Sequence, residues 1–169
     1  SFGGFPTIAC AARHGQRLHA AIAIDSPLFT REQRAARHAK RGPPRPPHPS
    51  RIYPSLEAAL ARFRFMPPQD CENLFLVDHI ARGSIKEVRN DDGTPGWTWR
   101  FDPFLWRDYE RGDSVAELAG ARCPFGLVRG ARSALVRPSV FAFARSVAPP
   151  GSPAIEVPDA DHHVMADQP

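Results

Sequence analysis

Three short apolar runs constrain the fold of this chain more than any other feature. They are "LHAAIAI" at 18–24, "CPFGLVRG" at 123–130 and "SPAIEVPD" at 152–159. Short continuous apolar runs indicate strands that are buried on both faces of a sheet. Between the last two runs lies "PSVFAFARSVA", a helical pattern with proline at its first position. Strand, helix and strand with short connections form a βαβ unit, so the sequence predicts an α/β fold with a parallel sheet.

The segment before the first strand predicts a helix. Residues 4–14 are rich in Ala and Ile, and Gly15 follows them as a stop signal. From Ser1 on, a helix of about 13 residues covers roughly 20 Å, and the strand 18–24 covers roughly 23 Å in the opposite direction. Because these lengths match, we expect Asp25 to arrive at the edge of the sheet where Ser1 lies.

The same edge collects further polar side chains. Ser133 follows the end of the second strand, and His162 follows the end of the third. In a parallel sheet the carboxyl ends of the strands share the edge at which ligands bind. Together with Ser1 and Asp25, these residues supply two hydroxyls, a carboxylate and an imidazole, from which a nucleophile, a base and an orienting group can be drawn.

A long segment, 29–118, interrupts the alternation of strands and helices. Helical patterns occur at 55–66, 71–88 and 114–122, and an aromatic stretch, "GWTWRFDPFLWRDY", precedes the last of them. Gly83 falls inside the second pattern and weakens it. We expect this segment to form a mostly helical cap over the edge of the sheet.

The net charge of +4 comes from one segment, residues 31–51. It holds seven basic residues and one acid, Glu32, and without it the chain has 15 basic and 17 acidic residues. Its proline-rich tail cannot be helical and predicts an extended linker or the edge of a lid. Because a charge run is more often an exposed face than a nucleic-acid site, we expect no nucleic-acid partner.

The cysteines and the hydropathy pattern bound the environment of the protein. Cys10, Cys71 and Cys123 are widely spaced and form no C-x-x-C arrangement. This usage predicts reduced, mostly buried thiols in a reducing compartment, so we expect a cytoplasmic protein. No apolar run approaches the roughly 18 residues that a membrane span needs. The sequence does not indicate an oligomeric state.

Four segments resemble parts of the α/β-hydrolase fold. The opening "SFGG" and the small-residue helix after it resemble the second half of the nucleophile elbow, G-x-S-x-G. "CPFGLVRGARSALV" resembles the seventh strand and acid loop of that family, and "VPDADHHVMADQP" resembles its histidine loop and the start of its last helix. Residues 29–118 lie where the family inserts a cap. The resemblance covers essentially the whole chain and implies a partial α/β-hydrolase fold that begins at the nucleophile elbow, so we expect the 169-residue fragment alone to be inactive.

The resemblance implies a serine-dependent hydrolase that cleaves an ester or related acyl bond through an acyl-enzyme. Ser1 would be the nucleophile and His162 the base, and the backbone N–H of Phe2 would be one oxyanion donor. The implied partner is a small-molecule acyl substrate, and no cofactor or metal is implied. The aromatic side chains that would line an acyl pocket, or else form the core of the cap, are Trp97, Trp99 and Trp106.

Two positions depart from the family pattern. Ser133 stands where many members carry the catalytic Asp, whereas a subset places the acid at the end of the sixth strand and retains a serine in the later loop. This subset implies that Asp25 is the acid and Ser133 a supporting residue. Asp161 stands where the family usually has glycine, which suits a turn with positive φ, and Asp tolerates that conformation better than most side chains but not freely. Asp161 also places a negative charge beside the imidazole, and the sequence leaves its effect on the loop open.

Other interpretations stay open at this point. Asp25 could instead close the turn "IDSPL" as a structural residue. An N-terminal-nucleophile hydrolase would use the α-amine of Ser1 as base, but it needs a strand after the serine, where "GGFP" is turn-like. The irregular acid loop also suits a non-catalytic, hydrolase-like binding protein. The predicted organisation is a hydrolase core at 1–28 and 119–169 with the cap at 29–118.

Overall fold

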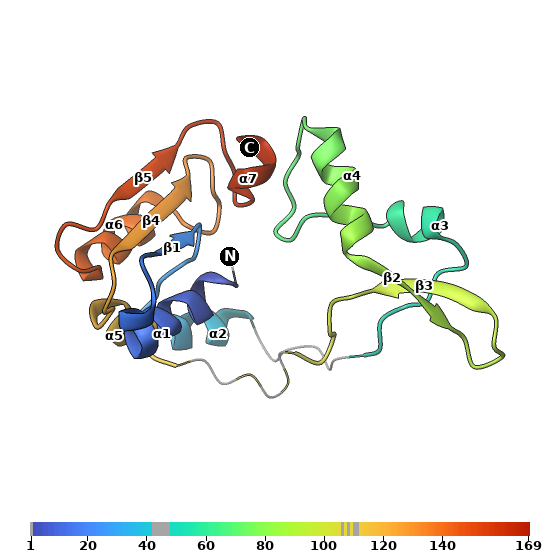
Figure 1. Ribbon diagram of the computed structural model, residues 1–169, viewed down its shortest axis with the longest axis horizontal. Helices are drawn as coiled ribbons and strands as arrows, with labels where there is room; N and C mark the ends of the chain where they lie inside the picture. Colours follow the sequence, from blue (N-terminus) through green and yellow to red (C-terminus); the bar gives the residue numbers. More distant parts are fainter. Residues whose placement is uncertain (1, 42–47, 106, 108, 110–111) are drawn as a thin grey trace. The chain divides into compact units, whose positions relative to one another are not determined.

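The computed structural model in Figure 1 describes residues 2–41, 48–105, 107, 109 and 112–169. The chain divides into two compact units. Unit 1 consists of Ser1–Pro43 and Arg111–Pro169, and unit 2 consists of Pro44–Glu110.

Unit 1 is built on a parallel sheet of three strands (Figure 1), as the sequence predicts. The strands are β1 (Ala21–Ile24), β4 (Phe125–Gly130) and β5 (Ala154–Val157), in the spatial order β1-β4-β5. Ala21 pairs with Phe125, and Leu127 pairs with Ala154. The carboxyl ends of all three strands therefore point the same way, which brings the residues after them to one edge.

The helices of unit 1 follow from local sequence signals. They are α1 (Gly4–His14), the short 3-10 helix η1 (Gly15–Arg17), α2 (Arg31–Arg41), α5 (Ser114–Ala119), α6 (Pro138–Val147) and α7 (Val164–Asp167). Thr30 and Gln33 form a capping box before α2, each N–H donating to the other side chain at 3.0 and 3.2 Å. Asp113 caps α5 by accepting from the N–H of Val115 and Ala116. Both α2 and α5 belong to unit 1 although they lie within the predicted insertion.

The core of unit 1 lies on one face of the sheet. Side chains from α1, α5 and α6, including Ile8, Leu118 and Ala144, pack there against Phe125 and Leu127. On the other face, Ile22, Ile24 and Ile155 are exposed to 57, 39 and 55%. The prediction that these runs are buried on both faces is therefore wrong for the described residues, because the core cluster covers only one of them.

Unit 2 combines two helices with an antiparallel hairpin. Its elements are α3 (Leu56–Leu60), α4 (Leu74–Gly83), β2 (Ile85–Arg89) and β3 (Pro95–Trp99). The prediction of a continuous helical segment at 71–88 is wrong beyond Gly83. The sequence "NDDG" after β2 is a hairpin signal that the helical reading overlooked.

The turn of this hairpin explains why the chain reverses there. Gly93 has φ +82°, a left-handed conformation that glycine adopts readily. Asp92 Oδ1 accepts from the hydroxyl of Thr94 at 2.6 Å and from its N–H at 2.9 Å. Both hydrogen bonds lower the pKa of Asp92 below its usual value, and the bond from the Thr94 hydroxyl has the larger effect.

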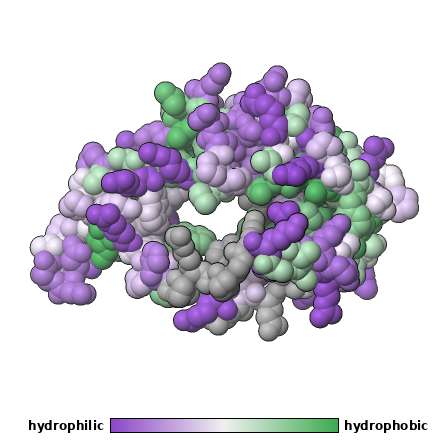
Figure 2. Space-filling model, turned by 180° about the vertical axis from the view of Figure 1, so that it is seen from behind, coloured by the Kyte–Doolittle hydropathy of each residue, from purple (hydrophilic) through white to green (hydrophobic). Residues whose placement is uncertain are grey.

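The surface and the thiols add two observations. Hydrophilic residues predominate on the face shown in Figure 2, with separate small patches of apolar residues. In the part of the chain that the structure describes, no helix is long and apolar enough to cross a membrane. Cys123 is buried and Cys71 is half-buried, but Cys10 is exposed, so the prediction of mostly buried thiols is wrong for Cys10.

Gly130, at the end of β4, lies where two loops of unit 1 approach each other closely. A Cβ at this position would overlap with the backbone oxygens of Asp161 and Ala160. We expect Gly130→Ala to lower the free energy of unfolding by about 1–3 kcal/mol, measured by urea denaturation, because backbone atoms must move.

Gly126→Ala on the same strand is the matched control. Its Cβ would meet Ile22 at an ordinary 3.5 Å. Stability should be unchanged or raised by up to about 1 kcal/mol, since alanine suits a strand better than glycine. Equal destabilisation by both substitutions would contradict this account.

Candidate active site

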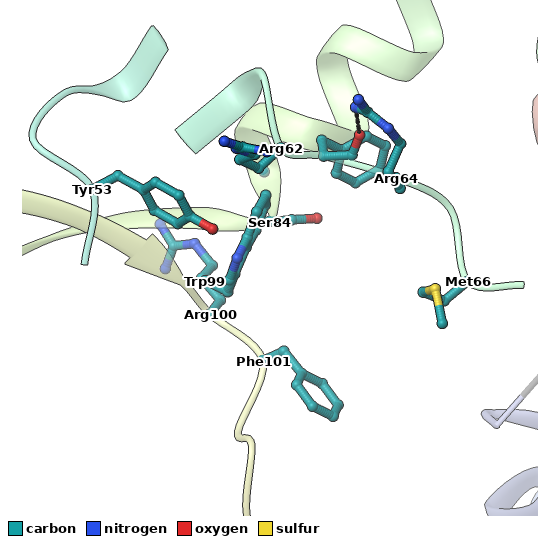
Figure 3. A pocket seen from close by; sticks show the side chains of 10 residues that line it. Tyr53, Arg62, Arg64, Met66, Ser84, Trp99, Arg100 and Phe101 are labelled. Carbon is teal, nitrogen blue, oxygen red and sulfur yellow. Dashed lines mark hydrogen bonds between the residues drawn. The ribbon is translucent and has the colours of Figure 1, made fainter. Parts of the chain in front are cut away.

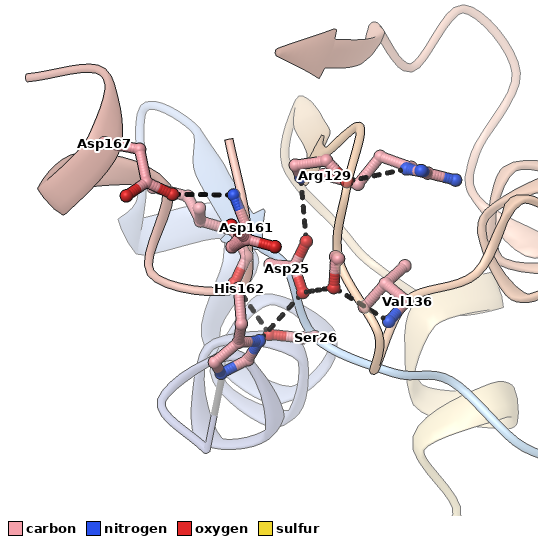
Figure 4. A network of polar contacts seen from close by, with 10 residues as sticks. Asp25, Ser26, Arg129, Val136, Asp161, His162 and Asp167 are labelled. Carbon is pink, nitrogen blue, oxygen red and sulfur yellow. Dashed lines mark hydrogen bonds and ion pairs between the residues drawn. The ribbon is translucent and has the colours of Figure 1, made fainter. Parts of the chain in front are cut away.

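Asp25 lies at the carboxyl end of β1 and is completely buried (Figure 4). Its N–H donates to the carbonyl oxygen of Val128 at 2.7 Å, which continues the parallel pairing beyond the last residue of β1. Its φ is +45°, a left-handed conformation that Asp tolerates better than most residues with a side chain. Strained backbone of this kind persists only where surrounding interactions fix it.

Three donors converge on the Asp25 carboxyl group. Oδ1 accepts from the hydroxyl of Ser133 at 2.6 Å and lies 2.8 Å from His162 Nδ1, and Oδ2 accepts from the N–H of Gly130 at 2.8 Å. Because a carboxylate can only accept, the close contact with His162 requires the proton on Nδ1. The second ring nitrogen, Nε2, is then the one that can accept a proton. The structure thus brings together three of the predicted site residues: Asp25, Ser133 and His162.

His162 is held by the loop between β5 and α7. Asp159 in this loop has φ +53°, and the carbonyl oxygen of Ala160 accepts from Arg132 N–H at 2.9 Å. His162 is 5% exposed, and its ring lies edge-to-face with that of His163, with ring centroids 4.8 Å apart. His163 precedes α7 as its N-cap residue. Contacts of the residues before and after His162 therefore fix the position of its imidazole.

Ser133 is held in the turn that follows β4. Its N–H donates to the carbonyl oxygen of Gly130 at 3.0 Å, and its hydroxyl oxygen accepts from Val136 N–H at 3.1 Å. The hydroxyl proton is therefore directed at Asp25. Sequence reasoning did not identify the N–H of Gly130 or that of Val136, because a backbone donor leaves no mark in the residue type.

Of the two N-terminal residues of the predicted site, the structure describes Phe2. Ser1 lies outside the described residues. Phe2 lies in a turn before α1, and its ring meets that of Phe5 edge-to-face at 6.4 Å. Gly4, the first residue of α1, lies so close to Ser26 that a Cβ on it would overlap with the Ser26 hydroxyl. The start of α1 therefore lies beside the residue that follows Asp25.

Of the predicted pocket tryptophans, Trp97 and Trp99 belong to unit 2, and Trp106 lies outside the described residues. Trp97 and Trp99 are on β3, and Trp97 pairs through its backbone with Tyr53. The Trp99 ring lies edge-to-face with Tyr53 at 6.1 Å and near Phe63 at 6.4 Å. An open pocket of about 640 Å³ is lined by Tyr53, Phe63 and Trp99. Figure 3 shows this pocket and labels Tyr53 and Trp99. A role of Trp97 or Trp99 in holding an acyl group stays a prediction.

Asp161 does not adopt the positive φ that the family's glycine would suit. The positive φ of this loop belongs to Asp159, and the N–H of Asp161 donates to the carboxyl group of Asp167 at 2.7 Å. The Asp161 side chain lies 3.5 Å from Arg132 Nε. The negative charge beside the imidazole is therefore partly balanced by a guanidinium. Among the described residues, no group of three or more His, Cys, Asp or Glu side chains is arranged to hold a metal ion.

Comparisons with known proteins give a fold. No model of a protein family matches the sequence, and no curated protein sequence matches it. The structure is similar to E-2-(acetamidomethylene)succinate hydrolase, with TM-score 0.72 and 23% identity over 100% of this chain and 60% of the other. An esterase from Mycobacterium tuberculosis gives 0.65 and 24% over 99 and 54%. The thioesterase domain of the curacin biosynthetic pathway gives 0.65 and 19% over 98 and 59%.

These similarities establish that the chain has part of the α/β-hydrolase fold. The predicted fold class is confirmed. The chain spans 54 to 60% of the length of these three solved chains. The order of β1, β4 and β5, with α6 between the last two, gives the parallel sheet on which Asp25 and His162 meet.

Removing the Ser133 hydroxyl tests the energetics of this network. Ser133→Ala takes one donor from the buried Asp25 carboxylate and leaves the Val136 N–H without its acceptor. We expect the free energy of unfolding to fall by about 1–3 kcal/mol in urea denaturation. Ser146→Ala on α6 removes an exposed hydroxyl that donates to the Phe143 carbonyl oxygen of its own helix, and it should leave stability nearly unchanged. A Ser133→Ala protein as stable as the control would show that the network contributes nothing.

Proposed function

We propose that the natural protein is a serine hydrolase that cleaves an ester or related acyl bond. Ser1 is the nucleophile, His162 the general base and Asp25 the acid that orients it. The observation that carries this proposal is the buried contact between Asp25 and His162 Nδ1 at 2.8 Å, which leaves Nε2 as the proton acceptor. The start of α1, three residues after Ser1, lies beside Ser26 and so supports the approach of Ser1 to this edge.

In this mechanism His162 Nε2 takes the proton of the Ser1 hydroxyl as its oxygen attacks the carbonyl carbon. The resulting imidazolium is stabilised by the negative charge of Asp25 at Nδ1. The N–H of Phe2 donates to the oxyanion of the tetrahedral intermediate. His162 then gives the proton to the leaving group, which departs and leaves an acyl-enzyme on Ser1. Water, deprotonated by the same nitrogen, releases the acid and restores Ser1.

The comparisons support acyl-bond hydrolysis as the reaction class. The similar solved structures include proteins named as an esterase and a thioesterase domain. We assign unit 2 to a cap that contributes to substrate choice, with residues 29–118 as the full insertion. Since the chain spans little more than half of its structural neighbours, the activity is assigned to the natural protein that contains it.

A fluorophosphonate probe tests the nucleophile. We expect the natural protein to be labelled covalently, with the adduct on the tryptic peptide that carries Ser1, and Ser1→Ala to abolish labelling. His162→Ala should slow labelling strongly while the protein stays folded. Absence of labelling in a folded protein would favour a non-catalytic binding protein of this fold, and labelling at another serine would overturn the assignment of Ser1.

Substitution of the acid tests the proposed triad. Asp25→Asn places an N–H₂ group where three donors converge and removes the charge that stabilises the imidazolium. We expect turnover of an ester substrate to fall on the order of 10³ to 10⁴-fold. Ser133→Ala keeps the charge and should cost roughly tenfold, the size of one neutral hydrogen bond.

The control for Asp25→Asn is Asp91→Asn, which removes an exposed carboxylate from the hairpin turn of unit 2. Its turnover should equal that of the unsubstituted protein. Near-normal turnover of Asp25→Asn, in a protein that still reacts with the probe, would show that another group is the acid.

A further inference from the structure

Arg129 carries a charge into the interior of unit 1. It lies on β4, on the same face of the sheet as Phe125 and Leu127, and is 1% exposed. Its guanidinium carbon lies 5.9 Å from the centroid of the Phe141 ring. Burying a guanidinium in an apolar core is costly unless it is paired and hydrogen-bonded. The contacts of this side chain therefore indicate which role compensates for the cost of burying it.

The guanidinium holds the turn after β4. Its Nε donates to the carbonyl oxygen of Gly130 at 3.1 Å, and its Nη2 donates to that of Ala131 at 2.6 Å. Nε also lies 3.3 Å from Glu156 Oε2 on the neighbouring strand β5. Two successive peptide groups at the end of β4 are thus held by one rigid, planar group. Figure 4 draws Arg129 beside this turn and Asp25.

The pairing of Arg129 is incomplete. Its Nη1 is buried and has no hydrogen-bond partner among the described residues. Within the part of the chain that the structure describes, its counter-charge is the partly exposed Glu156. A buried donor without a partner costs free energy, because it loses its water and gains no hydrogen bond in return. A methionine of similar length would fill the same space without this penalty.

The turn that Arg129 holds is the one that holds Asp25. The Gly130 carbonyl accepts from Arg129 and from Ser133 N–H, while the N–H of Gly130 donates to Asp25. The Ser133 hydroxyl is the second donor to Asp25 from this turn. A shift of the turn would therefore displace two of the three donors to the carboxylate and change its position against His162.

We infer that Arg129 is a positioning residue for the Asp25–His162 pair. It fixes the 130–133 turn, the turn fixes the carboxylate, and the carboxylate fixes the imidazole. This inference rests on the proposed function for its catalytic consequence, but the geometry on which it acts can be measured without turnover.

Arg129→Met is the test, with Arg145→Met, an exposed arginine on α6, as the matched control. The direct readout is the low-field proton NMR signal of the His162 Nδ1–H in its hydrogen bond to Asp25, assigned by its loss in Asp25→Asn. In Arg129→Met we expect this signal to shift or broaden while the midpoint of thermal unfolding stays within a few degrees. Turnover should fall roughly 10 to 100-fold with little change in KM, the size of a misplaced catalytic group. Arg145→Met should change neither the NMR signal nor the turnover.

A second variant covers the case in which Arg129→Met does not fold. Arg129→Lys keeps the charge and the apolar stem but lacks the fork that spans two carbonyl oxygens. The inference predicts a folded protein with a shifted signal and reduced turnover. An unchanged signal in a folded Met or Lys variant overturns it, and so does failure of both variants to fold, because Arg129 would then be a residue of the fold alone. A shifted signal in a protein without turnover would instead support the positioning role and refute the proposed function.

Discussion

The buried carboxylate of Asp25 is the point on which the organisation of unit 1 depends. It accepts from Gly130, Ser133 and His162, which come from two other segments of the chain. A buried charge without partners would be expensive, so these donors are required for the carboxylate to stay there. The same bonds hold the left-handed backbone of Asp25, and a strained residue at a sheet edge is typical of a functional site. The hydrogen bonds of this one carboxylate therefore link the ends of all three strands.

Close approach of the two loops makes this link possible. Gly130 leaves room for the backbone of Ala160 and Asp161, and Arg132 bonds to the same loop through its N–H and its side chain. The acid turn and the histidine loop consequently support each other. Asp161, the acid that precedes the imidazole, lies 3.5 Å from Arg132 Nε, so the guanidinium partly balances its charge.

The sequence predicts the parts of this structure that depend on local pattern. The apolar runs, the helix at 4–14 and the proline at the first position of α6 were sufficient for the parallel sheet, and strand lengths were sufficient to bring Asp25 and His162 to one edge. The hairpin of unit 2 was missed because the helical pattern continues past Gly83 into the residues of β2. The roles of Gly130 N–H and Arg129 could not be predicted, because they arise from backbone groups and from burial that only the folded chain defines.

A crystal structure of the natural protein after reaction with a phosphonate ester tests the central claim most directly, because it shows the nucleophile, base and acid in one state. The account predicts phosphorus bonded to Ser1 Oγ, His162 Nε2 within about 2.6–3.2 Å of that oxygen, and His162 Nδ1 still bonded to Asp25. Phosphorus on another side chain, or a His162 ring whose Nε2 faces away from Ser1 while Asp25 keeps its other partners, would contradict it.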